Sequence, residues 1–370
     1  MNIVDLFTGI GGLTFGFYYK KNANKFVRNK NNSFLFANEI DTLTSSMFTE
    51  NFPDINMVNK SIKEIQEKDL KRIIKNKKVD LIIGGPPCQS FSTIGRRIYD
   101  DRAKLYNEYY RILSALRPKA FLFENVKGIL SMHDSNGKSV IEIIKSKFYS
   151  KGYNIYCETL NAMNYGVPQN RERVFIVGVR KDLNLNWNFP KPENNSILTI
   201  KDAIGDLPVL KEGECVNKYT SDAKTNYQRL MRYNSRELRD HYCGQYGEKI
   251  RLVIKNVKQG EGKNDFNKLV DIGKIPKKYR LTSGYANTYG RLCENMPSTT
   301  ITNNLSSPSS LRCIHYSQNR ALTPREGARI QSFPDWFKFS NSRGLATRQI
   351  GNAVPPLLSI ALAKEFEKIL

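Results

Sequence analysis

The first half of the chain alternates short apolar runs with longer segments in which apolar residues recur at helical spacing. A short apolar run bounded by turn residues is typical of a buried strand, whereas recurrence about every three or four residues indicates a helix. The pattern predicts helices after the glycine loop at 9–12, around 62–73, and over 105–116, where Pro118 follows. Strands are predicted over residues 2–7, 33–38, 79–83, 120–123, 153–160 and 173–179.

Repeated strand–helix units indicate an α/β fold with a mostly parallel sheet that is covered by helices on both faces. In such sheets, ligands bind outside the carboxyl ends of the strands. Phe7, Glu39, the segment 84–88 and Glu124 all fall at predicted strand ends. We therefore expect these residues to share one edge of the sheet.

The pattern changes after Arg180, because residues 183–318 are rich in Asn, Lys, Tyr, Gly and Pro and show weak periodicity. The chain becomes apolar and helical again towards its end, which predicts a helix that returns to the first domain. We expect a catalytic domain of residues 1–185 plus 346–370, and a smaller, less regular domain of residues 186–345.

Two shorter segments carry local predictions. Thr323 and Glu326 form a capping box with Pro324 at the first helical position, which predicts a helix start with a packing role. Residues 20–32, which consist mostly of Lys and Asn, are expected to form a solvated loop.

The net charge of the chain indicates what kind of partner it binds. The 370 residues include 58 Lys and Arg against 35 Asp and Glu, a net charge of +23, which favours nucleic acid as a partner. No apolar run is long enough for a membrane span, and the N-terminus lacks the features of a signal peptide, so a cytoplasmic, nucleoid-associated protein is expected. The six cysteines and three histidines are dispersed, so we expect neither a metal site nor a disulfide framework.

Cys88 is the first candidate for chemistry. It lies in Gly-Gly-Pro-Pro-Cys-Gln-Ser-Phe-Ser, directly after a predicted buried strand. The two prolines restrict the loop, so the thiol is held at a strand end as a nucleophile would be. The alternative is that Cys88 is a small buried apolar residue.

Three further motifs lie near predicted strand ends. The loop Asp-Leu-Phe-Thr-Gly-Ile-Gly-Gly lacks the spacing of a dinucleotide fingerprint, which favours an adenosyl cofactor, with Glu39 on its ribose, over NAD or a turn without ligand. Glu124 could serve in acid–base catalysis. Arg171 and Arg173 would point the same way on an extended chain, either to bind a phosphate or base carbonyl or as a solvated charge cluster.

Taken together, seven blocks resemble the C5-cytosine DNA methyltransferases of bacterial and phage restriction-modification type. They are DLFTGIGG, NEID, GGPPCQSFS, ENVKG, QNRERV, LTPREGARIQSFP and QIGNAVPP, which occur in that order between residues 5 and 356. The resemblance implies a Rossmann-like S-adenosylmethionine-dependent domain and a smaller target-recognition domain. It also implies methylation of C5 of cytosine within a short, specific sequence of double-stranded DNA, with S-adenosyl-L-homocysteine as product and no metal.

The resemblance implies four catalytic residues. Cys88 would attack C6 of a cytosine that is flipped out of the duplex, and Glu124 would bind N3 and the amino group. Arg173 would contact O2, and Arg171 would lie nearer the backbone and the thiol.

For the cofactor, the resemblance implies a set of residues on the loop, the strand ends and the C-terminal motif. They are Phe7, Gly9, Ile10, Gly11, Gly12, Glu39, Ile40, Ser61, Ile62, Pro86, Leu105, Asn352 and Val354. One departure concerns the adenine amino group, because Ser61 stands where the family usually has an aspartate. Either Ser61 accepts that hydrogen bond without a charge, or Asn59 substitutes.

For DNA, the resemblance implies contacts from Ser90 and from Arg96 and Arg97, in a segment similar to the family's mobile loop. In the irregular region, the candidates for base and phosphate contacts are Tyr285, Tyr289, Arg291, Thr300 and Thr302. A monomer is expected, with a cognate restriction endonuclease acting separately.

Two other functions compete with this hypothesis. The first is a tRNA cytosine-5 methyltransferase of the same superfamily, which would carry a Cys-Phe-Thr signature where this chain has Thr299-Thr300-Ile301-Thr302. The second is a non-catalytic DNA-binding regulator, which would need neither a positioned thiol nor a cofactor loop.

Overall fold

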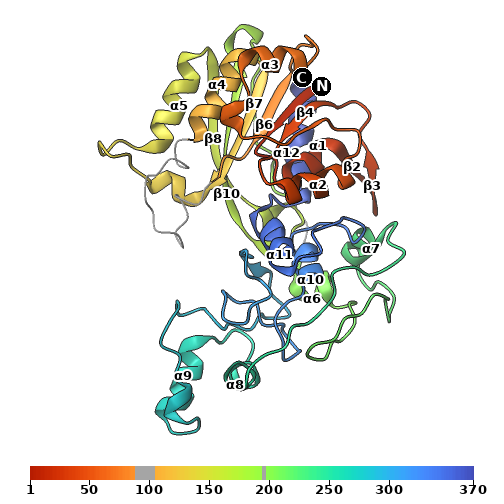
Figure 1. The fold of residues 1–370 in the computed structure, drawn as a ribbon, viewed down its shortest axis with the longest axis vertical. Helices are drawn as coiled ribbons and strands as arrows, with labels where there is room; N and C mark the ends of the chain where they lie inside the picture. The colour runs from red at the N-terminus through yellow and green to blue at the C-terminus, as the bar shows by residue number, and fades with distance from the viewer. Residues whose placement is uncertain (88–104, 194–196) are drawn as a thin grey trace.

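The computed structural model describes residues 1–87, 105–193 and 197–370. A seven-stranded sheet with the order β5-β4-β1-β6-β7-β10-β8 forms the upper part of the molecule in Figure 1. Neighbouring strands are parallel except at β10, which runs antiparallel to both β7 and β8. The strands are β1 (Asn2–Leu6), β4 (Ser33–Asn38), β5 (Met57–Val58), β6 (Leu81–Gly84), β7 (Ala120–Val126), β8 (Tyr153–Asn161) and β10 (Glu172–Arg180). The mostly parallel α/β sheet predicted from the sequence is confirmed.

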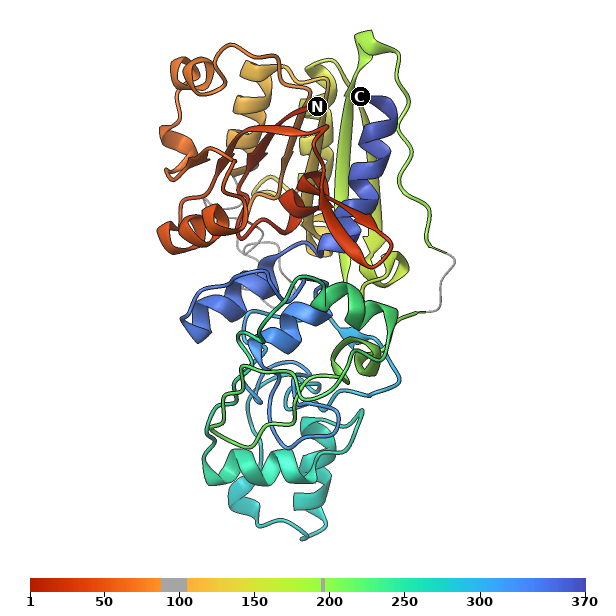
Figure 2. The same ribbon diagram turned by 90° about the vertical axis from the view of Figure 1, so that its right-hand side faces the viewer.

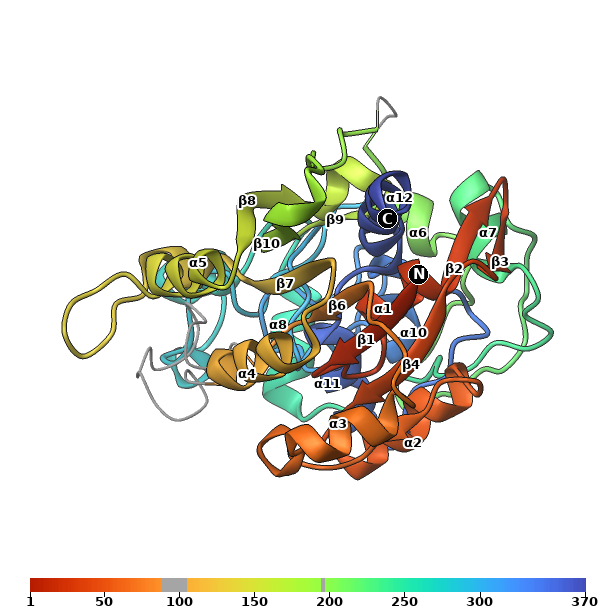
Figure 3. The ribbon, with the colours of Figure 1, turned by 90° about the horizontal axis from the view of Figure 1, so that it is seen from above.

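The sheet is covered on both faces because its central strands consist mostly of apolar residues that are buried on either side. Alternate residues of β6 enter different cores: Leu81 and Ile83 pack on one face, and Ile82 on the other. The first face is covered by α1 (Gly12–Tyr18) and α12 (Pro356–Ile369), the second by α3 (Glu67–Ile73), α4 (Tyr106–Leu116) and α5 (Val140–Ser150). Figure 3 shows α3, α4 and α5 on the side of the sheet opposite α12. Each fully buried apolar side chain contributes about 1.5–3 kcal/mol to this packing.

Two local predictions need correction. Residues 20–32 are not a solvated loop, because β2 (Tyr19–Asn22) and β3 (Lys25–Arg28) pair as an antiparallel hairpin. The hairpin forms because Phe26 is buried against Phe15, with ring centroids 5.0 Å apart. The expected helix around 62–73 is split into η1 (Ile62–Glu64) and α3, because Ile65 and Gln66 are extended.

Below the sheet lies a part of the chain with long loops and short helices (Figures 1 and 2). Its helices and those that join it to the sheet are α6 (Ile200–Ile204), α7 (Asn226–Arg232), α8 (Glu248–Asn256), α9 (Lys263–Asp271), α10 (Pro324–Ile330) and α11 (Arg343–Asn352). The capping box predicted at Thr323 and Glu326 is present at the start of α10. The predicted C-terminal helix is α12, which packs against α1 beside the sheet.

The remaining elements are short. Helix α2 (Thr42–Asn51) follows β4, and β9 (Gln169–Asn170) pairs with β11 (Ser298–Thr299). The other single turns are η3 (Lys127–Ser131), η4 (Ala162–Tyr165), η5 (Lys181–Leu183) and η6 (Lys277–Tyr279). Within the described residues, none of the helices combines the length and the apolar character that crossing a membrane requires.

Helix α10 is surrounded by buried ion pairs. Arg329 is fully buried and contacts Asp206 at 2.9 Å and Asp335 at 2.6 Å. On the same helix, Arg325 pairs with Asp240 at 2.8 Å, and Glu326 pairs with Arg320 at 2.6 Å. These contacts give the motif around α10 the packing role that its sequence suggests.

We predict that Arg329→Met destabilises the fold by about 3–5 kcal/mol, because it leaves the buried carboxylate of Asp335 without its ion-pair partner and leaves Asp206 with only the longer contact to Arg232, at 3.3 Å. Lys368→Met is the matched control, since it breaks an exposed pair with Glu365 and should change stability by about 1 kcal/mol or less. Urea unfolding of both variants measures the difference. Equal unfolding midpoints for the two variants would contradict a structural role for the network.

Candidate active site

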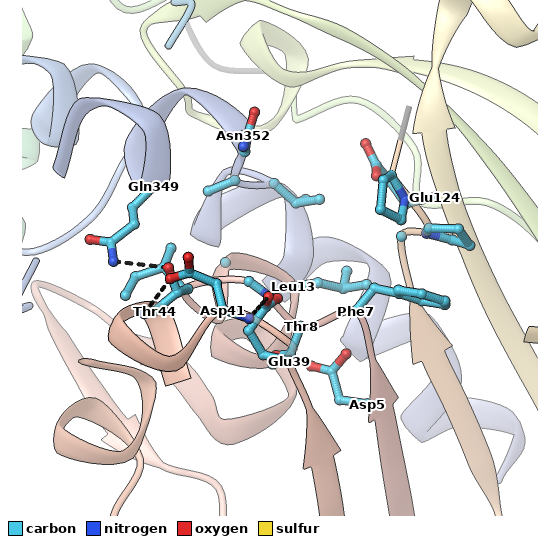
Figure 4. Close-up of a pocket in the computed structure, with 18 of the residues that line it drawn as sticks. Asp5, Phe7, Thr8, Leu13, Glu39, Asp41, Thr44, Glu124, Gln349 and Asn352 are labelled. Carbon is cyan, nitrogen blue, oxygen red and sulfur yellow. Dashed lines mark hydrogen bonds between the residues drawn. The ribbon is translucent and has the colours of Figure 1, made fainter. Parts of the chain in front are cut away.

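A cavity of about 430 Å³ opens at the carboxyl edge of the sheet, where β1, β4, β6 and β7 end and β10 begins (Figure 4). Residues from α11 and from the link between α11 and α12 form its opposite wall. All predicted cofactor residues except Gly11 line this cavity: Phe7, Gly9, Ile10, Gly12, Glu39, Ile40, Ser61, Ile62, Pro86, Leu105, Asn352 and Val354. Glu124 and Arg173 line it as well.

Gly11 serves the turn that leads into α1. Its φ is 91°, in the left-handed region, and a Cβ at this position would lie 2.4 Å from a ring carbon of Phe52. Both features require glycine. Gly11 therefore shapes the loop from behind the cavity.

The glycine loop is bound to the end of β4 through Glu39. The two carboxylate oxygens of Glu39 accept hydrogen bonds from the backbone N–H groups of Gly9 at 3.0 Å and Asp41 at 2.9 Å. Burial raises the pKa of Glu39, and these hydrogen bonds oppose the rise. Phe7 adopts a φ of 57°, which is uncommon for a residue with a side chain.

Asp5 is a site residue that the sequence analysis missed. It is fully buried, and its Oδ2 accepts hydrogen bonds from Thr8 at 2.9 Å and Thr14 at 2.5 Å. Its Oδ1 is buried without a hydrogen-bond partner among the described residues. Burial raises the pKa of Asp5 to about 7, against the opposing effect of the two threonines. An acid inside an otherwise apolar strand was the available signal.

Glu124 and Arg173 come together because β7 and β10 pair in antiparallel register, with Arg173 opposite Val126. Arg173 Nε lies 3.2 Å from Glu124 Oε1, and both side chains are largely buried. Burial raises the pKa of Glu124, while the charges of Arg173 and Arg171 lower it. A carboxyl group in this environment can hold a proton closer to neutral pH than an exposed glutamate does.

The segment that follows β6 runs directly over Glu124. A Cβ on Gly85 would lie 2.7 Å from Glu124 Oε2, so a larger residue here would displace the carboxyl group of Glu124. Asn125 Nδ2 donates to the carbonyl of Pro86 at 3.4 Å, which ties the segment to β7. Residues 85–87 therefore pass beside the carboxyl group of Glu124.

Arg171 is fully buried and contacts backbone rather than solvent. Its guanidinium donates to the carbonyls of Ile301 at 3.1 Å, Gly351 at 2.7 Å and Ala353 at 3.1 Å. It thereby holds the wall of the cavity that Asn352 and Val354 belong to. Its catalytic assignment stays a prediction.

The contacts of Asn59 favour Ser61 over Asn59 as the residue that accepts from the adenine amino group. Its Nδ2 donates to the carbonyls of Glu39 at 2.8 Å and Ile40 at 3.1 Å, and its Oδ1 accepts from Thr42 at 3.1 Å. Its amide is thus committed to the backbone at the end of β4, whereas Ser61 lines the cavity.

The prediction that Arg291 contacts DNA is wrong. It is buried, and its five N–H groups donate to the carbonyls of Val257, His315, Gln318 and Ile254 and to Asn319 Oδ1. No donor is left for DNA, so Arg291 is a structural residue.

The other DNA-binding assignments stay predictions. Tyr285 is exposed, whereas Tyr289, Thr300 and Thr302 are half-buried. Cys88, Ser90, Arg96 and Arg97 lie outside the described residues.

Several cavity residues come from segments that sequence reasoning did not connect. Arg348 Nη2 lies 3.8 Å from Asp41 Oδ2, and Gln349 Nε2 donates to Thr44 Oγ1 at 3.3 Å. These contacts join α11 to α2 across more than half of the chain, so no local pattern could reveal them. Within residues 1–87, 105–193 and 197–370, no group of three or more side chains has the composition of a metal site.

Known proteins are similar to this chain in sequence and in fold. The family model for C-5 cytosine-specific DNA methylases matches residues 1–368. The chain is 35% identical to the Type II methyltransferase M.AgeI of Thalassovita gelatinovora, with 98% of each protein covered. It is also 35% identical to the Type II methyltransferase M1.HphI of Haemophilus parahaemolyticus, over 100% of this chain and 87% of that protein.

A solved structure agrees with these relatives. A prophage-encoded protein of E. coli, described as a DNA modification methyltransferase, matches with a TM-score of 0.76 at 27% identity, over 100% of this chain and 99% of that one. The family match and the relatives all extend over nearly the whole chain. The chain therefore belongs to the family of C-5 cytosine-specific DNA methylases.

Proposed function

We propose that this protein methylates C5 of cytosine within a specific short sequence of double-stranded DNA, with S-adenosylmethionine as the methyl donor. The observation that carries the proposal is the single cavity that joins the glycine loop and Glu39 to the Glu124–Arg173 pair. One wall has the chemistry for an adenosyl ligand, and the other has a carboxyl group and a guanidinium for a pyrimidine edge.

The cavity suits this cofactor by its charged and polar groups. Four carboxyl groups line it, those of Asp5, Glu39, Asp41 and Glu124, which favours a ligand with cationic groups. Glu39 would bind the ribose hydroxyls, and the unpartnered Oδ1 of Asp5 is a buried acceptor that a cationic ligand group could use. When bound, S-adenosylmethionine supplies an electrophilic methyl group on a sulfonium sulfur.

The apolar residues Ile40, Ile62 and Leu105 would pack against the adenine, and Ser61 would accept from its amino group. Pro86 and the Asn352–Val354 segment would complete the pocket around the remainder of the ligand. These residues would hold the donor beside Glu124.

The chain's own residues would activate the cytosine. The Cys88 thiolate adds to C6 and forms a carbon–sulfur bond, while the electron pair of the C5–C6 double bond shifts to C5. Glu124 donates a proton to N3, and Arg173 binds O2, so the ring does not build up negative charge. C5 then takes up the methyl group. Loss of the C5 proton to water and expulsion of Cys88 as thiolate would then restore the C5–C6 double bond, and the proton on N3 would return to Glu124.

This chemistry requires the target base to leave the duplex, because C6 and N3 of a stacked, paired cytosine cannot meet a thiol and a carboxyl group together. Unpairing costs energy that contacts to DNA must offset. We assign those contacts to the recognition part, residues 186–345, and to the net charge of +23, which favours phosphate contacts.

The cellular role follows from the relatives named Type II methyltransferases. The protein would act in the cytoplasm, at the nucleoid, as a monomer. By methylating its target sequence it would protect host DNA from a separate restriction endonuclease. Bisulfite sequencing of DNA from cells that express the chain tests this function directly; an unmodified genome would refute it.

We predict that Cys88→Ser abolishes methyl transfer but leaves DNA binding within about twofold, because the serine hydroxyl is not ionised at neutral pH and adds to C6 poorly. The measurement pairs a tritium-transfer assay with a gel-shift titration on the modified sequence. Duplex oligonucleotides with 5-fluorocytosine at the target should trap wild type covalently and leave the variant free. Methyl transfer by the variant at the wild-type rate would overturn the mechanism.

We predict that Glu124→Gln slows single-turnover methylation about a hundredfold or more, because glutamine cannot donate a full proton to N3. In wild type, burial raises the pKa of Glu124. The protonated fraction of Glu124, and with it the methylation rate, should therefore fall as pH rises through this raised pKa. The variant should lack this alkaline decline and keep only the rise caused by ionisation of Cys88.

The matched control is Glu172→Gln, which removes an exposed acid that pairs with Lys127 at the same edge of the sheet but outside the cavity. It should retain the wild-type rate and pH profile. An identical alkaline decline in wild type and Glu124→Gln would remove Glu124 from the proton transfer.

A further inference from the structure

The described residues that line the cavity include only two cationic side chains, Arg173 and Arg348. Arg173 is committed to the site's chemistry, because it contacts Glu124 at 3.2 Å and donates to the carbonyl of Glu172 at 2.7 Å. Arg348 has a different environment. Its side chain is 54% exposed, and among the described residues its one ionic contact is with Asp41 at 3.8 Å.

Arg348 is oriented towards the cavity by its helix. It lies four residues before Asn352 on α11, so the two side chains share one face of the helix, and both line the cavity. Asp41 stands on the opposite side, at the start of α2, where its Oδ1 accepts from the N–H of Thr44 at 2.8 Å. Figure 4 shows Asp41 on the side of the cavity that faces Asn352, next to the hydrogen bond between Gln349 and Thr44.

The contact between Arg348 and Asp41 is weak. A distance of 3.8 Å between two half-exposed side chains is too long for a hydrogen bond, and solvent screens such pairs strongly. The guanidinium of Arg348 makes no hydrogen bond to the other described residues. Its donors are therefore available to a ligand at little cost.

An adenosyl amino-acid cofactor has one group that conflicts with this cavity, namely its carboxylate. Glu39 and Asp41 would repel it, and so would Asp5 and Glu124 in their ionised forms. A guanidinium binds a carboxylate through paired, charge-assisted hydrogen bonds. Of the two arginines in the cavity, Arg173 is paired with Glu124 and is assigned to the base, so Arg348 is the one available to the carboxylate.

We propose that Arg348 binds the carboxylate at the amino-acid end of the cofactor, and that Asp41 holds the guanidinium over the cavity until the ligand replaces it. This inference rests on the proposed function, because it assumes the adenosyl ligand. Arg348 is thus a specificity residue that distinguishes a complete cofactor from adenosyl compounds without a carboxylate.

The test compares two ligands that differ only in that group. They are S-adenosylhomocysteine and S-adenosyl-3-thiopropylamine, which is the same molecule without its carboxylate. Calorimetric titration of the full chain gives both dissociation constants, with no methyl transfer involved. Wild type should bind S-adenosylhomocysteine about tenfold more tightly than the decarboxylated compound, which corresponds to one charge-assisted contact.

In Arg348→Gln this preference should disappear, because S-adenosylhomocysteine binds about tenfold more weakly while the affinity for the decarboxylated compound is unchanged. Arg348→Lys should keep part of the preference, since it keeps the charge without the paired donors. Lys364→Gln is the matched control: it removes one positive charge from an exposed position of α12 outside the cavity and should retain the full preference.

Asp41→Asn removes the carboxylate that competes with the cofactor for Arg348, so its effect on the ligand preference should be opposite to that of Arg348→Gln. Asparagine still caps α2, so the fold is kept, but the carboxylate that competes for Arg348 is gone. The preference for S-adenosylhomocysteine should rise by about two- to threefold over wild type. A fall in that preference would overturn the proposal.

Different results would refute the proposed function and the role of Arg348. If wild type binds neither ligand, the proposed function fails. If wild type binds S-adenosylhomocysteine and Arg348→Gln keeps the wild-type preference, or loses affinity for both ligands equally, the role of Arg348 fails alone. Unchanged ligand binding with weaker DNA binding in Arg348→Gln would assign the residue to a phosphate contact and overturn the proposal as well.

Discussion

The site depends on the direction of one strand. Parallel strands deliver residues to the carboxyl edge of a sheet only from their C-terminal ends, as β1, β4, β6 and β7 do here. Strand β10 runs the other way, so its N-terminal residues reach that same edge. This reversal brings Arg173 to Glu124 and places Arg171 where it binds the carbonyls of Gly351 and Ala353. The catalytic pair and the far wall of the cavity are therefore positioned by the same few residues.

Buried arginines organise the part of the chain below the sheet. Arg291, Arg320, Arg325 and Arg329 are buried, and each donates hydrogen bonds to carbonyl or carboxylate oxygens. Long loops with little regular structure leave many carbonyls unpaired, and a guanidinium can bind several at once. Part of the net charge of +23 therefore stabilises the fold and does not face DNA. A partner class inferred from total charge remains valid, but individual arginines cannot be assigned to the DNA surface from their sequence context.

The electrostatics of the cavity combine two requirements. A glutamate that protonates a base needs burial to raise its pKa, and an adjacent arginine limits that rise. Asp5, Glu39 and Asp41 give the remainder of the cavity a negative character that suits a cationic donor. Both requirements are met because the carboxyl groups belong to different strands whose ends converge at one edge.

The sequence by itself predicted the α/β sheet and the positions of its main strands along the chain, because apolar runs and glycine turns are local signals. The family resemblance of its motifs pointed to most of the residues that line the cavity. Phe7, Glu39 and Glu124 could be placed at one edge since each directly follows or ends a predicted strand. Tertiary structure alone decided that Arg291 is buried, that Asn59 is committed to backbone carbonyls, and that Arg348 faces Asp41. These outcomes depend on which distant segments pack together. The sequence does not show whether a polar side chain contacts solvent, a carbonyl or a ligand. Only the surroundings of that side chain in the folded chain decide between these contacts.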